Sequence, residues 1–389
     1  MSVTSGWIGA SDADIVVFNK GGRDFRWKAL QAGEEAPREF FYGYMELATS
    51  GARAAMAPVA GAVPGRLGAI ADVLDSALAN ATLFGERPLA LRLIAPALRD
   101  RRMLVSFTDG FSMTLGLAGR HVLGRAVRIG GFHCLSDIEA RARRWARPWV
   151  RNRIRAALAG LDHAFFFGPA DRDECVRRYG IDAARTSIFP FGVDTAFWRP
   201  EPDAPAADFV VAVGQDPNRD YDLLAAAPGN HPTRIITRQA IAIPAGATHV
   251  RTTVGDYFGS DSMSDADIRR LYNAARAVVI PLKDVFQPSG YSVTLQAMSC
   301  ARPVILTRTR GLWAPELFRD GENCLLVPPG DAAALGAAIG RVRGDEALAR
   351  RIGSAARATA EAHFQLTRNA DSLAALVARG EALASARTP

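Results

Sequence analysis

The sequence predicts an α/β protein of two domains, each built on a parallel sheet with helices on both faces. Three observations predict it. Short apolar runs alternate with stretches of helical length, one proline-rich segment interrupts the alternation, and 389 residues are more than a single core usually accommodates. Hydrophobic residues make up 49% of the chain and charged residues 22%, which is ordinary for a folded domain and excludes bulk disorder.

In the first half of the chain, short apolar runs have the length of buried strands. The first run, residues 15–18, ends in Asn-Lys-Gly-Gly and therefore leads into a glycine turn. Four similar runs follow, at residues 103–107, 126–130, 164–167 and 186–189. Stretches of helical composition lie between them, for example at residues 37–47 and 170–179. Strands that alternate with helices in this way predict a parallel sheet.

A proline-rich segment, Arg-Pro-Glu-Pro-Asp-Ala-Pro at residues 199–205, has the composition of a linker. We therefore predict an N-terminal domain over residues 1–200, a C-terminal domain over residues 201–365, and a C-terminal helix over residues 366–389 that packs back on the N-terminal domain. Ligands of such sheets bind beyond the carboxyl ends of the strands. With two facing sheets, that place is the cleft between the domains.

After this linker the alternation restarts. The predicted strands are residues 208–213, 233–237, 277–281 and 303–307, and the predicted helices are residues 265–275 and 292–299. Ser264 is the expected N-cap of the first helix, with Asp267 as its reciprocal partner.

The formal net charge is +7, and nearly all of the positive charge is arginine, because lysine occurs only at Lys20, Lys28 and Lys283. Two explanations remain open. The arginine bias, together with abundant alanine, reflects either a GC-rich bacterial genome or an affinity for phosphate-bearing ligands and anionic membranes.

The four cysteines, Cys134, Cys175, Cys300 and Cys324, form no Cys-x-x-Cys pair and predict free thiols in a reducing cytosol. The first residues lack the pattern of a signal peptide, and no segment approaches the ~20 apolar residues that span a bilayer. These features predict a cytoplasmic protein that meets a membrane, if at all, on its inner face.

The turn before residues 292–299 is a candidate anion site. Gly290 lies in this turn, and Tyr291, Ser292 and Val293 would present backbone N–H groups that have no helical acceptor. The helix dipole adds partial positive charge there, which suits a diphosphate. The alternative is a plain strand–loop–helix connection.

Several short motifs around this turn stand in one order and spacing. They are Phe-Gly-Val-Asp-Thr at 191–195, which continues to Pro200, Val-Gly at 213–214, Asn-Arg-Asp-Tyr at 218–221, Gln-Ala-Met at 296–298, Pro-Val at 303–304 and the stretch 320–331. In these motifs the chain resembles retaining GT-B glycosyltransferases of family four, also called glycosyl transferases group 1, from about residue 162 to its end.

The resemblance implies a GT-B architecture, with two Rossmann-like domains whose parallel sheets face each other across a cleft. It also implies transfer of a sugar from a nucleotide-diphosphate sugar, held mainly by the C-terminal domain, to an acceptor hydroxyl with retention of configuration. The acceptor can be a sugar, a lipid or a small metabolite.

This chain departs from the family pattern at two glutamates. The first, which usually meets hydroxyls of the donor sugar, is Pro288 here, so that Gln287 or Ser289 would take over its contact. The second, which usually accepts hydrogen bonds from the ribose, is Gln296. An amide oxygen still accepts such bonds, but without the charge assistance of a carboxylate.

A third departure concerns the cations for the donor phosphates. The arginine expected directly after Gly214 is Gln215 in this chain. Arg219 is therefore the matched cation, and Lys283 is an unmatched neighbour that can also reach a phosphate. We expect both to stabilise the leaving diphosphate.

In the first half, Gly21 and Gly22 match the glycine loop whose backbone approaches the donor phosphates in this family; a simple turn is the alternative. His133 either faces the donor sugar or is a hydrogen-bonded structural histidine. Asp109 either holds an acceptor hydroxyl or caps a helix.

Residues 138–155 are dense in arginine and tryptophan, and Pro148 is expected to interrupt any helix there. The side chains that would cluster are Arg141, Arg144, Trp145, Trp149 and Arg155. They form either a contact with an anionic membrane or a solvated face. No nucleic-acid-binding module is recognisable, so nucleic acid is not an expected partner.

We predict no metal site and no cofactor besides the nucleotide-diphosphate sugar, which acts as co-substrate. The two Asp-x-Asp matches, at residues 12–14 and 265–267, precede their elements instead of following a strand. Two other functions remain open: a catalytically silent relative that binds a nucleotide-sugar, and a nucleotide-sugar epimerase on the same fold.

Overall fold

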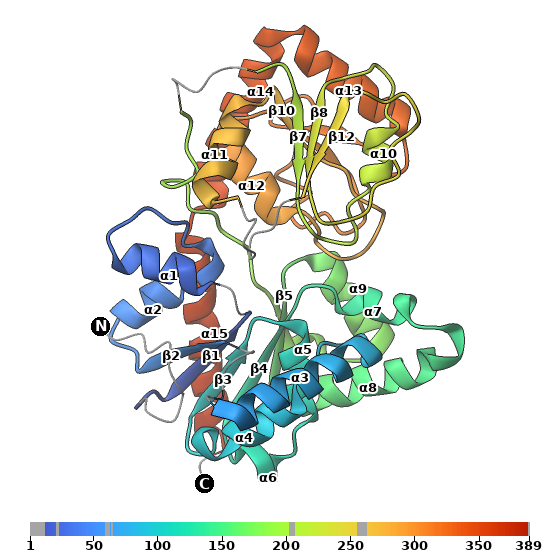
Figure 1. Ribbon diagram of the computed structural model, residues 1–389. Helices are drawn as coiled ribbons and strands as arrows, with labels where there is room; N and C mark the ends of the chain where they lie inside the picture. The colour runs from blue at the N-terminus through green and yellow to red at the C-terminus, as the bar shows by residue number, and fades with distance from the viewer. Residues whose placement is uncertain are drawn as a thin grey trace. The chain divides into compact units, whose positions relative to one another are not determined.

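The computed structural model describes residues 12–20, 23–58, 63, 65–201, 207–254 and 263–387. The chain divides into two compact units. Unit 1 comprises Met1–Phe25, Phe40–Pro190 and Thr367–Pro389, and unit 2 comprises Arg26–Glu39 and Phe191–Leu366. Each unit contains a six-stranded sheet, and all strand pairs are parallel (Figure 1). The predicted α/β fold with two parallel sheets is confirmed.

The sheet of unit 1 has the order β2-β1-β3-β4-β5-β6. Its strands are β1 (Ile15–Asn19), β2 (Ala54–Pro58), β3 (Met103–Ser106), β4 (Val127–Phe132), β5 (His163–Phe166) and β6 (Thr186–Ile188). The strand β1 pairs with β2 on one side and with β3 on the other. The switch point of this sheet therefore lies between β1 and β3. The strand β2, at the sheet edge, was not predicted from the sequence, because its alanines and proline have low strand propensity.

Helices cover both faces of this sheet. They are α2 (Tyr44–Thr49), α3 (Gly65–Thr82), α4 (Pro88–Leu98), α5 (Asp109–Leu117), α6 (Arg120–Leu123), α7 (Leu135–Arg141), α8 (Arg147–Gly160), α9 (Pro169–Tyr179) and α15 (Thr367–Ser385), with 3-10 turns η2 (Glu39–Phe41), η3 (Arg144–Ala146) and η4 (Ala183–Arg185). Gly130 faces Ser112 of α5, whereas the neighbouring Ile129 faces Gly380 of α15. Since successive strand residues point to opposite faces, α5 and α15 cover opposite sides.

Two predicted helical segments differ from the structure. Residues 37–47 are not one helix, because Tyr42 and Gly43 have φ angles of +52° and +81° that end η2 before α2 begins. Pro148 does not interrupt a helix but lies in the first turn of α8, where no backbone N–H is needed. The arginines and tryptophans of residues 138–155 therefore belong to α7, η3 and α8, with residues 142 and 143 between α7 and η3.

The sheet of unit 2 has the order β12-β11-β10-β7-β8-β9. Its strands are β7 (Val210–Val213), β8 (Thr233–Ile236), β9 (Val250–Thr253), β10 (Ala277–Ile280), β11 (Val304–Thr307) and β12 (Leu325–Val327), and its helices are α10 (Tyr221–Ala225), α11 (Asp265–Ala274), α12 (Tyr291–Ser299), α13 (Ala332–Gly344) and α14 (Glu346–His363). The helix α1 (Asp24–Gln31) runs from the last residues of the first segment of unit 1 into unit 2. In unit 2 the chain switches direction between β7 and β10.

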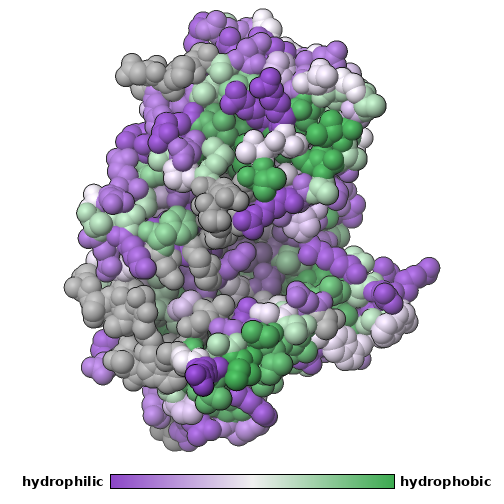
Figure 2. All heavy atoms as spheres, in the orientation of Figure 1, coloured by the Kyte–Doolittle hydropathy of each residue, from purple (hydrophilic) through white to green (hydrophobic). Residues whose placement is uncertain are grey.

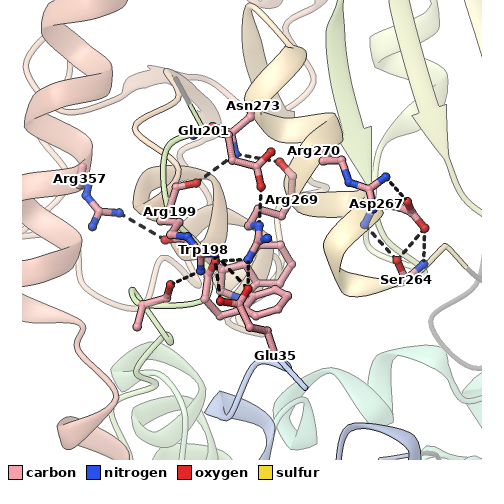
Figure 3. Close-up of polar contacts among 12 residues, drawn as sticks. Glu35, Trp198, Arg199, Glu201, Ser264, Asp267, Arg269, Arg270, Asn273 and Arg357 are labelled. Atoms are coloured by element: carbon pink, nitrogen blue, oxygen red, sulfur yellow. Dashed lines mark hydrogen bonds and ion pairs between the residues drawn. The ribbon is translucent and has the colours of Figure 1, made fainter. Parts of the chain in front are cut away.

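Unit 2 ends at Leu366, one residue after the predicted limit of 365, whereas its second segment begins at Phe191, before the predicted limit of 200. Residues 191–201 lie within unit 2, in a polar network with α11 and Glu35 (Figure 3). Arg269 donates to Glu201 at 2.7 Å and to Glu35 at 3.2 Å. The predicted linker therefore begins inside unit 2; its residues 202–205 lie outside the described residues. The predicted cap of α11, in which Ser264 and Asp267 exchange hydrogen bonds, is confirmed.

A buried ion pair holds the N-terminal segment 26–39 in unit 2. Arg26 donates from Nε and Nη2 to the two carboxylate oxygens of Asp265, both at 2.7 Å. The side chains are 1% and 8% exposed.

None of the helices in the described ranges is long and apolar enough to cross a membrane.

Arg26→Met is expected to destabilise the protein by about 3–5 kcal/mol, because it leaves the Asp265 carboxylate buried without its cation. The double variant Arg26→Met/Asp265→Leu should recover most of this loss. Urea unfolding of wild type and of both variants measures the free energy of unfolding. Arg350→Ala, which breaks an exposed pair with Glu346, is the control and should change stability little. A double variant as unstable as Arg26→Met would contradict this role of the pair.

Candidate active site

Two loops meet where the sheet of unit 2 switches direction. They leave the carboxyl ends of the adjacent strands β7 and β10, which is where parallel sheets usually bind ligands. The backbone N–H of Asp220 donates to Pro281 O at 2.9 Å, and that of Lys283 donates to Asn218 O at 2.9 Å. These bonds join the loops into one rim.

Arg219 is buried in this rim between two glycines. Its side chain is only 4% exposed. A Cβ atom at Gly214 would stand 3.0 Å from Arg219 Nε, and one at Gly290 would stand 3.3 Å from Arg219 Nη1. Both glycines have positive φ angles, 143° and 80°. The guanidinium therefore lies against backbone that only glycine can provide.

The donors of Arg219 are not all used. Nε and Nη1 are buried and donate to no acceptor in the part of the chain that the structure describes. Gly290 is also the N-cap of α12, so that Ser292 and Val293 lie in the first turn, where N–H groups have no intrahelical acceptor. A buried cation with unused donors beside a helix N-terminus is suited to bind an anion.

A cluster of polar side chains lies next to this arginine. Asn218 Nδ2 donates to Gln287 Oε1 at 2.7 Å and to the buried Ser289 Oγ at 3.3 Å. Asp216 accepts from the backbone N–H of Asn218 at 2.9 Å and from Gln287 Nε2 at 3.3 Å. Gln287 and Ser289, the predicted replacements for the missing glutamate, thus both accept a hydrogen bond from Asn218. Asn218 itself was not predicted as a ligand.

Gln215 and Lys283 lie differently. Gln215 accepts from the backbone N–H of Arg238 at 2.7 Å, in the loop after β8. Lys283 is exposed, and its Nζ donates to Pro217 O at 3.3 Å. Lys283 therefore remains near the loop that carries Arg219, with its charge in solvent.

Gln296 is buried on α12 and faces a carboxyl group. Its Nε2 donates to Glu39 Oε1 at 3.1 Å, and Trp198 Nε1 donates to the same oxygen at 2.7 Å. Glu39 is fully buried, and this burial raises its pKa to about 7, against the hydrogen bond from Gln296. Gln296 Oε1 accepts no hydrogen bond from the described residues. The amide therefore directs its Nε2 to Glu39 and leaves its buried oxygen without a donor in the described part of the chain.

Aromatic rings flank the start of α12. Tyr291 packs against Phe191 with ring centroids 4.5 Å apart and against Trp313 at 6.2 Å. The buried indole N–H of Trp313 has no acceptor among the described residues. Trp313 follows β11, and no motif in the sequence marked it as part of the site.

In unit 1, Asp109 anchors the loop after β4 by hydrogen bonds. Its carboxylate accepts from the backbone N–H groups of His133 and Cys134, both at 3.0 Å. The N-cap of α5 is Thr108, so Asp109 is not the helix cap that the sequence left open. Its contact with an acceptor stays a prediction.

His133 is packed and hydrogen-bonded within unit 1. Its Nε2 lies 3.0 Å from Phe107 O, and its ring stacks on Phe167 with centroids 3.9 Å apart. Burial lowers the pKa of His133 below its ordinary value, although the Asp109 carboxylate opposes this. These are the contacts of a structural histidine, and a contact with the donor sugar stays a prediction.

Gly21 and Gly22 lie outside the described residues. The next residue, Arg23, donates from Nη2 to Tyr42 Oη at 3.3 Å and also binds Asn19.

Three of the four acidic side chains in the two Asp-x-Asp matches have other partners. Asp14 Oδ2 lies 3.6 Å from Arg53 Nε, Asp265 pairs with Arg26, and Asp267 exchanges hydrogen bonds with Ser264, the N-cap of α11. Within the described ranges, no three histidine, cysteine or acidic side chains come together in a way that could hold a metal ion.

Comparisons with known proteins show which sequences and folds this chain resembles. Residues 212–345 match the family model described as Glycosyl transferases group 1. The chain is 26% identical over 217 residues to the alpha-maltose-1-phosphate synthase of Mycolicibacterium smegmatis, with 46% of this chain and 55% of that protein covered. The chain spans about half the length of the curated relatives it matches.

Solved structures with the same fold cover nearly the whole chain. Sucrose-phosphate synthase from Thermosynechococcus elongatus superposes with a TM-score of 0.67 at 18% identity, over 95% of this chain and 99% of that one. Anabaena HepE in complex with UDP-glucose superposes with a TM-score of 0.64 at 17% identity, over 94% and 99%. The predicted GT-B fold is confirmed.

Glu39 makes stability depend on pH. Its folded-state pKa of about 7 lies above the ordinary 4.5, so the folded chain binds a proton more tightly than the unfolded chain. This contribution is complete below 4.5 and is lost as pH rises through 7. From about pH 4 to about pH 8, wild type should lose about 3 kcal/mol relative to Glu39→Gln, measured by urea unfolding.

Glu322→Gln, at an exposed position, is the control and should follow wild type at every pH. A Glu39→Gln variant whose stability runs parallel to that of wild type across this range would show that Glu39 does not hold the extra proton.

Proposed function

Because this GT-B chain belongs, through residues 212–345, to the glycosyl transferases group 1 family, we propose that it moves a sugar from a nucleotide-diphosphate sugar to an acceptor hydroxyl. The observation that supports this most is the buried guanidinium of Arg219. Its two unused donors lie beside the N-terminus of α12, where a diphosphate would satisfy them.

The donor would bind along the rim of unit 2. The diphosphate meets Arg219 and the first-turn N–H groups of Ser292 and Val293. Donor sugar hydroxyls meet Gln287 or Ser289, and ribose hydroxyls donate to the unused Oε1 of Gln296. The complex of Anabaena HepE with UDP-glucose supports a nucleotide-sugar as the class of donor.

Glycosyl transfer develops positive charge at the anomeric carbon and negative charge on the departing diphosphate. Arg219 and the α12 dipole are fixed by their packing, so they need no reorganisation to stabilise that negative charge. Lys283 would add a mobile charge. We propose that the diphosphate takes the proton of the acceptor, which attacks from the leaving-group face with retention, and that no metal takes part.

In unit 1, we propose that His133 contacts the donor sugar and that Asp109 holds a hydroxyl of the acceptor. The acceptor is a sugar, a lipid or a small metabolite. The neutral state that burial favours for His133 would suit an uncharged sugar hydroxyl.

Arg219→Ala is expected to lower turnover by about two orders of magnitude, because one preorganised interaction with the leaving group contributes roughly 3 kcal/mol. Thermal unfolding should show a folded variant. Arg219→Lys should recover part of the activity, and Arg350→Ala, on an exposed face of α14, should keep all of it. Near-wild-type turnover in Arg219→Ala would remove this residue from the mechanism.

The donor and the reaction are tested together. A thermal-shift screen against UDP-, GDP-, ADP- and dTDP-sugars identifies the nucleotide, since a ligand at 100 times its Kd stabilises by about 2.7 kcal/mol. With the donor found, release of nucleoside diphosphate supports transfer or hydrolysis. Binding without release would favour a silent relative, and recovery of isomerised donor would favour an epimerase.

Gln296→Glu restores the usual family residue but places a second carboxyl group against Glu39. We expect nucleotide binding about tenfold weaker, because two like charges cannot both be buried there. The exchanged pair Glu39→Gln/Gln296→Glu should bind at least as tightly as wild type. Calorimetric titration with the nucleoside diphosphate measures both. Tighter binding by Gln296→Glu alone would contradict the pairing of these residues.

A further inference from the structure

In unit 1, the solvent-facing side of α3 is apolar. Leu67, Ile70, Val73 and Leu74 are between 52% and 69% exposed. Their spacing of three and four residues is that of the stripe which a helix usually packs against its core. Here that stripe points to solvent.

The polar residues of α3 explain its orientation. Asp75 is fully buried and accepts from the backbone N–H groups of Leu89 at 3.1 Å and Ala90 at 2.8 Å, which caps the start of α4. Asp72 accepts from Arg87 at 3.1 Å. Since turning α3 over would bury the apolar stripe but expose both anchors, the structure holds the apolar side outward.

The exposed apolar surface extends beyond α3. Leu83, directly after α3, is 47% exposed. The ring of the next residue, Phe84, lies with its centroid 5.9 Å from that of Trp149 on α8, which is half-exposed. Figure 2 shows apolar side chains gathered on this face, over α3. The apolar patch consists of Leu67, Ile70, Val73, Leu74, Leu83 and Trp149. A contiguous patch of this kind marks an interaction site.

The unpaired charges of segment 65–98 are positive. All three acidic residues of this segment are engaged: Asp72 and Asp75 as above, and Glu86 with Arg153. In contrast, two exposed arginines of the segment, Arg66 on α3 and Arg92 on α4, have no carboxylate partner in the described part of the chain. The surface is therefore apolar at its centre and cationic at its edges.

We propose that the apolar patch docks on an anionic lipid surface. The aliphatic side chains of α3 enter the acyl boundary, and Trp149 and the arginines lie at the level of the headgroups, where tryptophan and cations are favoured. A second copy of this chain fits less well, because a symmetric contact would bring the same cationic edges together. The surface therefore centres on α3, with residues 138–155 at its margin.

The test is co-sedimentation of the full chain with vesicles of phosphatidylcholine and phosphatidylglycerol, and with vesicles of phosphatidylcholine alone. Wild type should bind the anionic vesicles at least about tenfold more tightly, because each arginine near the surface contributes about fivefold. Leu67→Glu/Leu74→Glu should lose binding by at least about a hundredfold, since both carboxylates would have to enter the acyl boundary.

Val254→Glu is the matched control, because Val254 is 71% exposed on unit 2, and it should bind like wild type. Thermal unfolding and nucleotide-induced shifts should be unchanged in all variants, which separates this surface from the donor site. The proposal is overturned if wild type ignores anionic vesicles, or if Leu67→Glu/Leu74→Glu binds them as well as Val254→Glu. A dimer in light scattering that only Leu67→Glu/Leu74→Glu abolishes would assign the patch to a second copy instead.

Discussion

A guanidinium that is buried with unused donors is costly to fold, and Arg219 is such a group. The surrounding structure is arranged to keep it there. Gly214 and Gly290 leave room for it, and the two loops that carry them are joined by backbone hydrogen bonds at the switch point of the sheet. An anionic ligand would satisfy these donors and so offset that cost.

The second feature of this site is a buried carboxyl group beside Gln296. The family resemblance implies a glutamate at the position of Gln296, whereas in this chain the neighbouring carboxyl group is that of Glu39. Glu39 comes from the segment 26–39, which the Arg26–Asp265 ion pair and the network around Arg269 hold in unit 2. A segment from the beginning of the chain thus completes the environment of a helix near its end. The orientation of the Gln296 amide depends on it.

In unit 1, two carboxylates anchor the backbone. Asp75 and Asp109 each accept two backbone N–H groups and fix the start of α4 and the loop after β4. The carboxylate of Asp75 is thereby kept away from the exposed surface of α3. The same anchoring that orders the fold leaves the outer side of α3 apolar and its border cationic. The proposed lipid contact therefore rests on other residues than the proposed donor site.

The sequence by itself determined what depends on neighbours along the chain. The apolar runs of nine strands, the reciprocal cap of Ser264 and Asp267, and the glycine turn before α12 follow from periodicity and local hydrogen bonding, and they were predicted correctly. Arg219 and Gly214 were selected from motifs that lie close together in the sequence, and Gly290 was selected from the turn before α12. Only the tertiary structure decided that Glu39 faces Gln296 and that Arg26 pairs with Asp265. These pairs are 257 and 239 residues apart, and their proximity comes from packing that no local pattern encodes. The direction of the apolar stripe of α3 is also tertiary, because a helical period shows that a stripe exists but not which side it faces.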